Sequence, residues 1–99
     1  MGMDDNVKKI RNTFGDPDEV CCGLAEECGE LIQAVLKYRR VVTKMNPTPM
    51  KFDEAVDHMY EEAADVLLYI EVLGLNKHFL KQIMEQKAER WVKRLEARG

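Results

Sequence analysis

Hydrophobic and polar residues recur with a helical period along almost the whole chain. Apolar residues return at steps of three and four across residues 17–45, 53–74 and 77–97, the spacing of one helix face. A shorter helix is expected from Asp4 to about Thr13. No strand-like alternation persists, and β-branched residues are few. The pattern therefore predicts an all-α fold, a bundle of about four helices.

Capping residues and prolines mark the ends of these helices. Asp16 followed by Pro17 is typical of an N-cap with proline at the first helical position. The second helix is expected to reach about Met45, before Pro47 and Pro49 interrupt the pattern. The other expected boundaries are Thr48 or Asp53 at the start of the third helix and Gly74 or Asn76 at its end.

The third helix carries apolar residues on more than one side. Beyond its main stripe, residues 63–75 include Ala64, Leu67, Leu68 and Tyr69. A helix that is apolar nearly all round must be buried nearly all round, and a chain this small offers little to cover it. We therefore expect a homo-oligomer in which a second chain packs against this helix.

Acidic residues on the second and third helices have a specific spacing. Glu27 and Glu30 lie one turn apart at the margin of one apolar stripe, and Glu62 and Asp65 repeat this geometry. Antiparallel packing of the two helices would bring these four carboxylates into one groove, where they repel unless a cation lies between them. Hard oxygen ligands suit Mg²⁺, with Mn²⁺ as an alternative, and Mg²⁺ held this way usually bridges to phosphates.

Other interpretations of these polar residues stay open. Acid pairs three residues apart are also common on solvated helices. Neither His58 nor His78 follows a glutamate by three residues, which argues against a di-iron site. His58 lies one turn before Glu62, either as an outer partner of the cluster or as an ordinary histidine. Gly29 permits a close approach by a ligand or a backbone, or is a tolerated weak helix former.

Composition narrows the class of protein. The 99 residues fit one domain spanning 1–99, and 45% hydrophobic with 33% charged residues suits a folded, non-membrane chain. No apolar run approaches a membrane span, and residues 1–6 lack the apolar region typical of a signal peptide, so a cytoplasmic location is expected. Cys21, Cys22 and Cys28 lack disulfide or zinc spacing and are expected to be free, partly buried thiols.

Charge is distributed unevenly along the chain. Residues 1–76 hold 15 acids and 8 bases, whereas residues 77–99 hold 3 acids and 7 bases, with a net charge of −3 overall. The acidic total argues against nucleic-acid binding. Lys87, Arg90 and Arg94 form a basic edge on the fourth helix that could bind phosphate oxygens, or could be a solvated face.

Two motifs in this chain resemble a known family. Glu26, Glu27 and Glu30 form EExxE within LAEECGELIQA, and Glu62 and Asp65 form ExxD within EEAADVLLYI. These motifs are similar to those of the MazG-like all-α nucleoside triphosphate pyrophosphohydrolases, and the resemblance spans roughly residues 20–95.

The resemblance implies a fold, a reaction and roles for residues. It implies an all-α dimer or dimer of dimers that cleaves nucleotides between the α- and β-phosphates with Mg²⁺, giving a monophosphate and pyrophosphate. Metal ligands would be Glu27, Glu30, Glu62 and Asp65. Glu26, or one of the ligand glutamates such as Glu27, would orient or deprotonate the attacking water. The alternatives are phosphoribosyl-ATP pyrophosphohydrolase, a dUTP- or dCTP-specific relative, and a non-catalytic helical interaction module.

Overall fold

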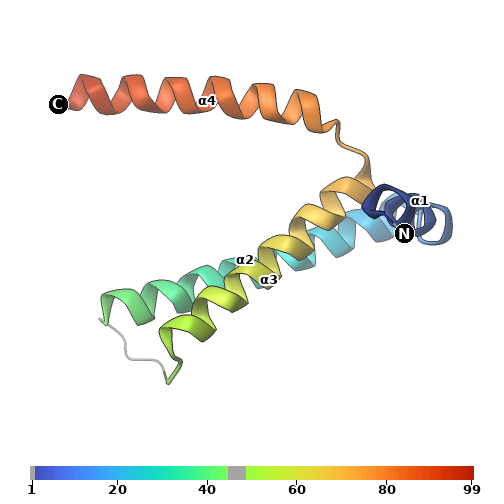
Figure 1. Ribbon diagram of the computed structural model, residues 1–99, viewed down its shortest axis with the longest axis horizontal. Helices are drawn as coiled ribbons and strands as arrows, with labels where there is room; N and C mark the ends of the chain where they lie inside the picture. Colours follow the sequence, from blue (N-terminus) through green and yellow to red (C-terminus); the bar gives the residue numbers. More distant parts are fainter. Residues whose placement is uncertain (1, 45–48) are drawn as a thin grey trace.

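The computed structural model describes residues 2–44 and 49–99, and within them it contains four helices and no strand (Figure 1). The helices are α1 (Met3–Thr13), α2 (Pro17–Thr43), α3 (Phe52–Leu73) and α4 (Lys77–Arg98). The all-helical class and the four helices expected from the sequence are thereby confirmed.

Local capping explains where α2 and α4 begin. The Asp16 carboxylate accepts a hydrogen bond from the backbone N–H of Asp18 at 3.1 Å, and Pro17 is the first helical residue, as predicted. Asn76 caps α4 by accepting from the N–H of Phe79 at 3.0 Å. Asn76 therefore starts α4 rather than ending α3.

The ends of the α2–α3 connection differ in part from the expectation. α2 ends at Thr43, with Lys44 in the left-handed region (φ 57°), while the expected limit Met45 and the expected cap Thr48 lie outside the described residues. α3 begins directly after Lys51, so Asp53 is not its cap but lies in its first turn, where a carboxylate favours the positive helix end. Gly74 ends α3 with φ 92°, as glycine can do without strain.

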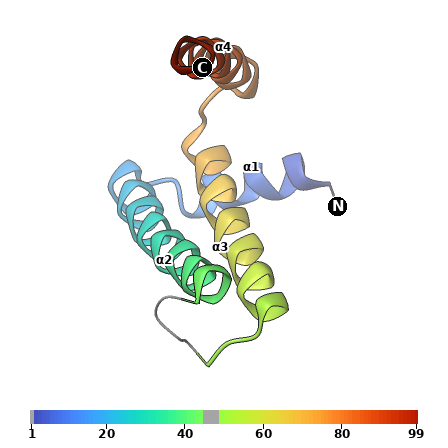
Figure 2. The same ribbon diagram turned by 90° about the vertical axis from the view of Figure 1, so that its left-hand side faces the viewer.

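α2 and α3 lie side by side as an antiparallel hairpin, which both views show (Figures 1 and 2). Ala34 on α2 and Ala55 on α3 are completely buried in it. Val20 and Val72 join Val7 of α1 in a small core at the other end of the hairpin. The small side chains of Ala34 and Ala55 let the two backbones approach closely, and the hairpin contains most of the helix–helix packing of the chain.

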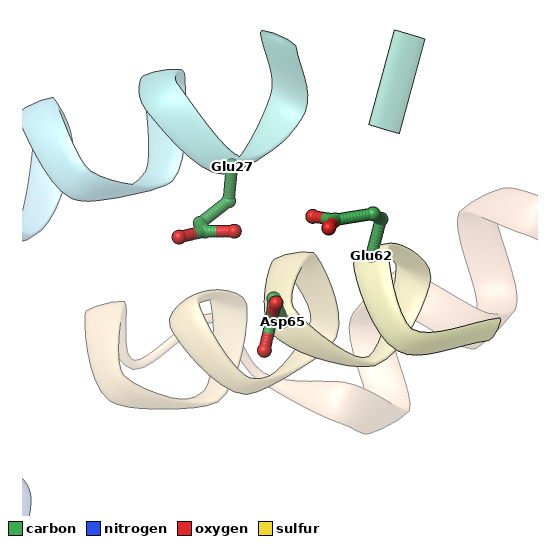
Figure 3. Close-up of side chains that lie close together, drawn as sticks. All are labelled: Glu27, Glu62 and Asp65. Carbon is green, nitrogen blue, oxygen red and sulfur yellow. The ribbon is translucent and has the colours of Figure 1, made fainter. Parts of the chain in front are cut away.

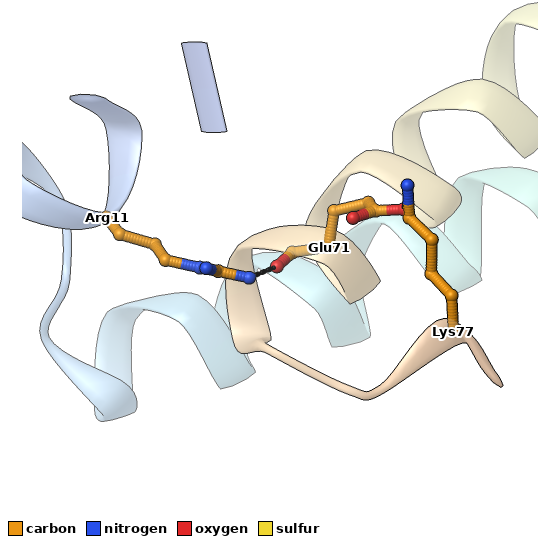
Figure 4. A network of polar contacts seen from close by, with 3 residues as sticks. All are labelled: Arg11, Glu71 and Lys77. Atoms are coloured by element: carbon orange, nitrogen blue, oxygen red, sulfur yellow. Dashed lines mark hydrogen bonds and ion pairs between the residues drawn. The ribbon is translucent and has the colours of Figure 1, made fainter. Parts of the chain in front are cut away.

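α1 closes the end of α3. The guanidinium of Arg11 donates to the carbonyl of Val72 at 3.1 Å and to the carbonyl of Glu71 (Figure 4). These carbonyls belong to the last turn of α3, where the Glu71 carbonyl also accepts from the N–H of Gly74 at 3.1 Å. The Glu71 side chain pairs with Lys77 Nζ at 2.8 Å, which links the start of α4 to the end of α3 (Figure 4).

α4 stands apart from the other helices (Figures 1 and 2). It packs against none of α1, α2 or α3, and none of its residues is buried. Its predicted apolar stripe is therefore uncovered: Leu80 is half-buried, whereas Met84, Ala88, Trp91 and Leu95 are exposed. The chain is a helical hairpin with two attached helices, not a closed four-helix bundle.

The predicted stripe of α2 also faces largely outward. Leu24, Leu31 and Tyr38 are half-buried, but Cys21, Ala25, Cys28, Ile32, Val35 and Val42 are exposed. The expectation of partly buried thiols is wrong, because all three cysteines are free and exposed. The reason is that α2 turns its Val20–Ala34 side, not its most apolar side, toward α3.

No helix in the described part of the chain is long and apolar enough to span a membrane.

Candidate metal centre

Three carboxylates from the two helices of the hairpin meet at one place. Glu27 of α2 faces Glu62 and Asp65 of α3 (Figure 3), and one carboxylate oxygen from each lies within 4.8 Å of the others. Glu27 and Glu62 are half-buried, and Asp65 is exposed. The cluster thus lies at the edge of the helix–helix contact, open to solvent on one side.

The backbone places these acids on the packed side of both helices. On α2, Val20, Glu27 and Ala34 follow one another at steps of seven, so Glu27 lies between two buried residues. On α3, Glu62 lies seven residues after the buried Ala55, and Asp65 lies seven before the buried Val72. Positions at these seven-residue steps, which face the other helix of the hairpin and are called seam positions, normally hold apolar side chains. Acids at three of them cost packing, which favours a functional explanation.

The electrostatics of the cluster follow from this placement. The pKa of Glu27 is raised above its ordinary value, first by desolvation and then by the negative charges of Asp65, Glu62 and Glu30, with a hydrogen bond to Asp65 adding to the effect. The Glu62 Oε2 atom is buried without a hydrogen-bond partner. An arrangement that accumulates negative charge and leaves a buried carboxylate oxygen unsatisfied fits a cation with hard oxygen ligands such as Mg²⁺.

The other predicted acids lie beside the cluster rather than in it. Glu30, one turn along α2 from Glu27, is exposed and is not among the three whose oxygens converge, although its charge raises the Glu27 pKa. Glu26 is also exposed and points away from the seam by its position on the helix. Glu27 lies at the seven-residue steps from Val20 to Ala34 and Glu26 does not, so the sequence alone distinguishes the two glutamates.

The basic residues expected to contact phosphate lie on a helix that is not packed against the acid-bearing hairpin. Lys87, Arg90 and Arg94 are exposed on α4, which packs against neither helix of the hairpin (Figure 1). The structure therefore brings together Glu27, Glu62 and Asp65 and does not bring the basic edge to them.

Comparison with known families identifies the family of this chain. Residues 16–98 match the MazG nucleotide pyrophosphohydrolase domain, a match that contains α2, α3 and α4. The chain therefore belongs to the MazG nucleotide pyrophosphohydrolase domain family. Comparisons with curated proteins and with solved structures found no significant match.

Proposed function

We propose that this chain is a Mg²⁺-dependent pyrophosphohydrolase of nucleoside triphosphates, releasing a nucleoside monophosphate and pyrophosphate. The observation that carries the proposal is the convergence of Glu27, Glu62 and Asp65 from two helices at seam positions. Membership of the MazG nucleotide pyrophosphohydrolase domain family supports the reaction class. Mn²⁺ could replace Mg²⁺, because carboxylate oxygens bind both ions.

The residues of this chain have distinct tasks in the proposed reaction. Glu27, Glu62 and Asp65 would hold the metal, and Glu30 could complete the set from one turn away on α2. When bound, Mg²⁺ supplies charge neutralisation for the phosphates and a more acidic water. Water adds its oxygen to the α-phosphorus, the bond from that phosphorus to the bridging oxygen breaks, and pyrophosphate leaves.

A carboxylate must take the proton of the attacking water. Glu27 and Glu26 are the two candidates, one in the cluster and one beside it on the exposed side of α2. The proton then passes to bulk water through the open side of the cluster.

A second copy of the chain would supply the missing positive charge. α3 contains seven acids and no lysine or arginine, whereas α4 contains seven lysines and arginines and three acids. Because α4 packs against no helix of its own chain, Lys87, Arg90 and Arg94 would bind substrate phosphates in a site of a partner chain. The proposed protein is therefore a homo-oligomer, a dimer or a tetramer.

Uncovered apolar surface supports this assembly. Leu67 and Leu68 of α3 are 59% and 39% exposed, and they line a cavity of about 420 Å³ with Leu80 and Met84 of α4. Trp91 is 63% exposed further along α4. Apolar surface on both helices would be removed from water by a second chain.

Free exposed thiols fit a reducing compartment, which supports a cytoplasmic location.

Pyrophosphate release from a panel of ribo- and deoxynucleoside triphosphates with Mg²⁺ tests the proposed function. The panel includes dUTP, dCTP and phosphoribosyl-ATP, so that each related activity has its own result. Glu62→Gln is the inactive variant, and Glu61→Gln, its exposed neighbour on α3, is the matched control. We expect the wild type to release pyrophosphate, Glu62→Gln to abolish this release and Glu61→Gln to preserve it. No release from any substrate would instead favour a non-catalytic helical module.

A further inference from the structure

His58 occupies a seam position next to the acid cluster. It follows the buried Ala55 by three residues and precedes Asp65 by seven, so it lies on the side of α3 that faces α2. Its Nε2 atom is 3.4 Å from Glu62 Oε1, and the side chains of His58 and Glu62 are 29% and 15% exposed. The partner that it meets is thus one of the three converging carboxylates.

The buried atoms of this pair indicate where the imidazole proton lies. His58 Nδ1 is buried and has no hydrogen-bond partner. A buried N–H without an acceptor costs more than a buried lone pair without a donor, and the carboxylate needs a donor. The tautomer with hydrogen on Nε2 satisfies both conditions, because it places a donor 3.4 Å from Glu62 Oε1. The separation is slightly longer than a usual N–H···O bond, so a small side-chain rotation completes the contact.

The contact also determines which Glu62 oxygen remains available. Oε1 is the oxygen that lies beside His58 Nε2, whereas Oε2 is buried without a hydrogen-bond partner. The Glu62 carboxylate is directed toward Glu27 and Asp65 (Figure 3). An imidazole that holds one oxygen of the carboxylate restricts its rotation and presents the other oxygen for coordination.

We propose that His58 is a positioning residue of the metal centre, which holds the Glu62 carboxylate in its ligating orientation through Nε2–H. This inference rests on the proposed function, because Glu62 is taken as a metal ligand. A purely structural role predicts something different. A histidine that only packs in the seam would be replaced by leucine at a gain in stability, with no effect on metal binding.

Three substitutions separate positioning from packing. His58→Leu fills the seam with an apolar side chain but removes the donor. His58→Gln keeps an N–H donor at nearly the same reach as Nε2. His78→Leu is the matched control, since His78 lies on exposed α4 and contacts Gln82 rather than an acid. For each purified chain, the Mg²⁺ concentration that gives half of the metal-induced rise in Tm is measured, together with kcat and KM for nucleotide.

The expected results have opposite signs for stability and metal binding. His58→Leu should keep or raise the Tm without metal, yet weaken Mg²⁺ binding by about 10-fold, the lower end for loss of an outer hydrogen bond to a ligand. Its kcat should fall, while KM for nucleotide at saturating Mg²⁺ changes little. His58→Gln should stay within about 3-fold of the wild type, and His78→Leu should match it.

Each contrary result overturns a defined statement. Wild-type Mg²⁺ affinity and kcat in His58→Leu would overturn the positioning role alone. Equal losses in His58→Leu and His58→Gln would show that the donor is not the relevant group and would also overturn it. A wild-type chain with no Mg²⁺-dependent change in Tm and no hydrolysis would overturn the proposed function itself. If His58→Leu does not fold, His58→Gln alone decides, because loss of Mg²⁺ binding in that donor-retaining variant contradicts the proposal.

Discussion

α3 and α4 are both 22 residues long, but only α3 is packed against other helices of the chain. α3 is held by α2 along its length and by Arg11 at its end, and its acids are fixed near those of α2. α4 begins at a good cap and packs against no other helix, and its bases are exposed, although Lys77 also pairs with Glu71. Fixed negative charge and unplaced positive charge thus lie on separate parts of one chain. A phosphate-binding metal site needs both.

The largest expected effect is on the acidic side of this comparison. Asp65→Asn removes a proposed ligand but also one source of repulsion, so hydrolysis should fall at least about 100-fold, beyond the usual effect of an outer partner. The Tm without metal should be kept or raised, because Asp65 raises the pKa of Glu27 by repulsion. Glu30→Gln should show the same signs with a smaller loss, since Glu30 lies outside the converging three.

Calorimetry or a dye-based melt with and without Mg²⁺ measures the change in Tm, and pyrophosphate release measures the change in hydrolysis. Asp57→Asn, an exposed acid on the same helix, is the control and should leave both unchanged. Full activity in Asp65→Asn would contradict the metal assignment. A large loss of Tm without metal would instead show that Asp65 is part of a structural network.

Mixing two inactive chains tests whether the two regions act across a subunit boundary. One chain carries Glu62→Gln, and the other carries Met at positions 87, 90 and 94, which keeps much of the packed stem without the charge. If α4 acts in a partner site, a mixed dimer has one site with both wild-type parts. About a quarter of the wild-type activity should then return after co-expression in equal amounts.

Differently tagged chains confirm that mixed oligomers are present. If α4 served its own chain, every site would retain one defect and no activity would return. Full activity in the triple variant alone would show that the basic edge is only a solvated face.

The sequence predicted the four helices and several of their ends better than it predicted the surroundings of α4. Asp16, Pro17 and Gly74 act locally, so capping rules sufficed for them. Glu62 and Asp65 share a helix face by spacing alone. The side that α2 turns to α3 depends on the small residues Ala34 and Ala55, whose close packing outweighs the larger stripe around Ile32.

The position of α4 was not predictable from its own residues. Its stripe of Met84, Trp91 and Leu95 predicts that something covers it, but not which chain. Periodicity specifies a face, whereas the partner of that face is decided by tertiary or quaternary contacts. Arg11 was missed for a similar reason, because its acceptors lie 60 and 61 residues away in sequence.

Assembly through α3 gives a third test. Leu68→Glu should shift the protein toward monomers, because it would place an unpaired charge in the proposed interface. Sedimentation at micromolar concentration measures the change, with Glu54→Gln on the exposed first turn as control. A wild-type chain that is a stable monomer would contradict the proposed homo-oligomer directly.

Two glycines of α2 distinguish the packed side from the open side of the hairpin. A Cβ at Gly23 would overlap the ring of Tyr69, whereas a Cβ at Gly29 would meet nothing within 4 Å in this chain. Gly29→Ala should therefore stabilise by about 0.5–1 kcal/mol through helix propensity. Gly23→Ala should destabilise by about 1 kcal/mol, because the cost of overpacking exceeds the same gain.

Denaturant unfolding of both variants gives these free energies directly. Destabilisation by Gly29→Ala in the oligomer, but not in a dissociated Leu68→Glu background, would show that a second chain approaches the helix at Gly29. Equal stabilisation of both variants would mean that the Tyr69 ring moves aside freely.

The smallest expected effect is the pH dependence of the metal-free protein, and it separates the hairpin from α4 by the pH range in which stability is lost. Glu27 and Lys77 both have raised pKa values, but burial and repulsion disfavour the charged Glu27, whereas Glu71 favours the charged Lys77. Glu27 thus contributes stability below its ordinary pKa, and this stability is lost as pH rises through the raised value. The stability that Lys77 contributes through its pair with Glu71 persists across that pH range and is lost only at alkaline pH.

Without metal, the difference in Tm between wild type and Glu27→Gln should therefore grow as pH rises above about 4.5, with the variant the more stable. Lys77→Met should give a nearly constant difference from the wild type over the same range. Saturating Mg²⁺ should reverse the first trend, because a cation favours the ionised glutamate that its absence disfavours. A Glu27→Gln difference that is independent of pH would show that the carboxylates do not interact strongly enough to form one site.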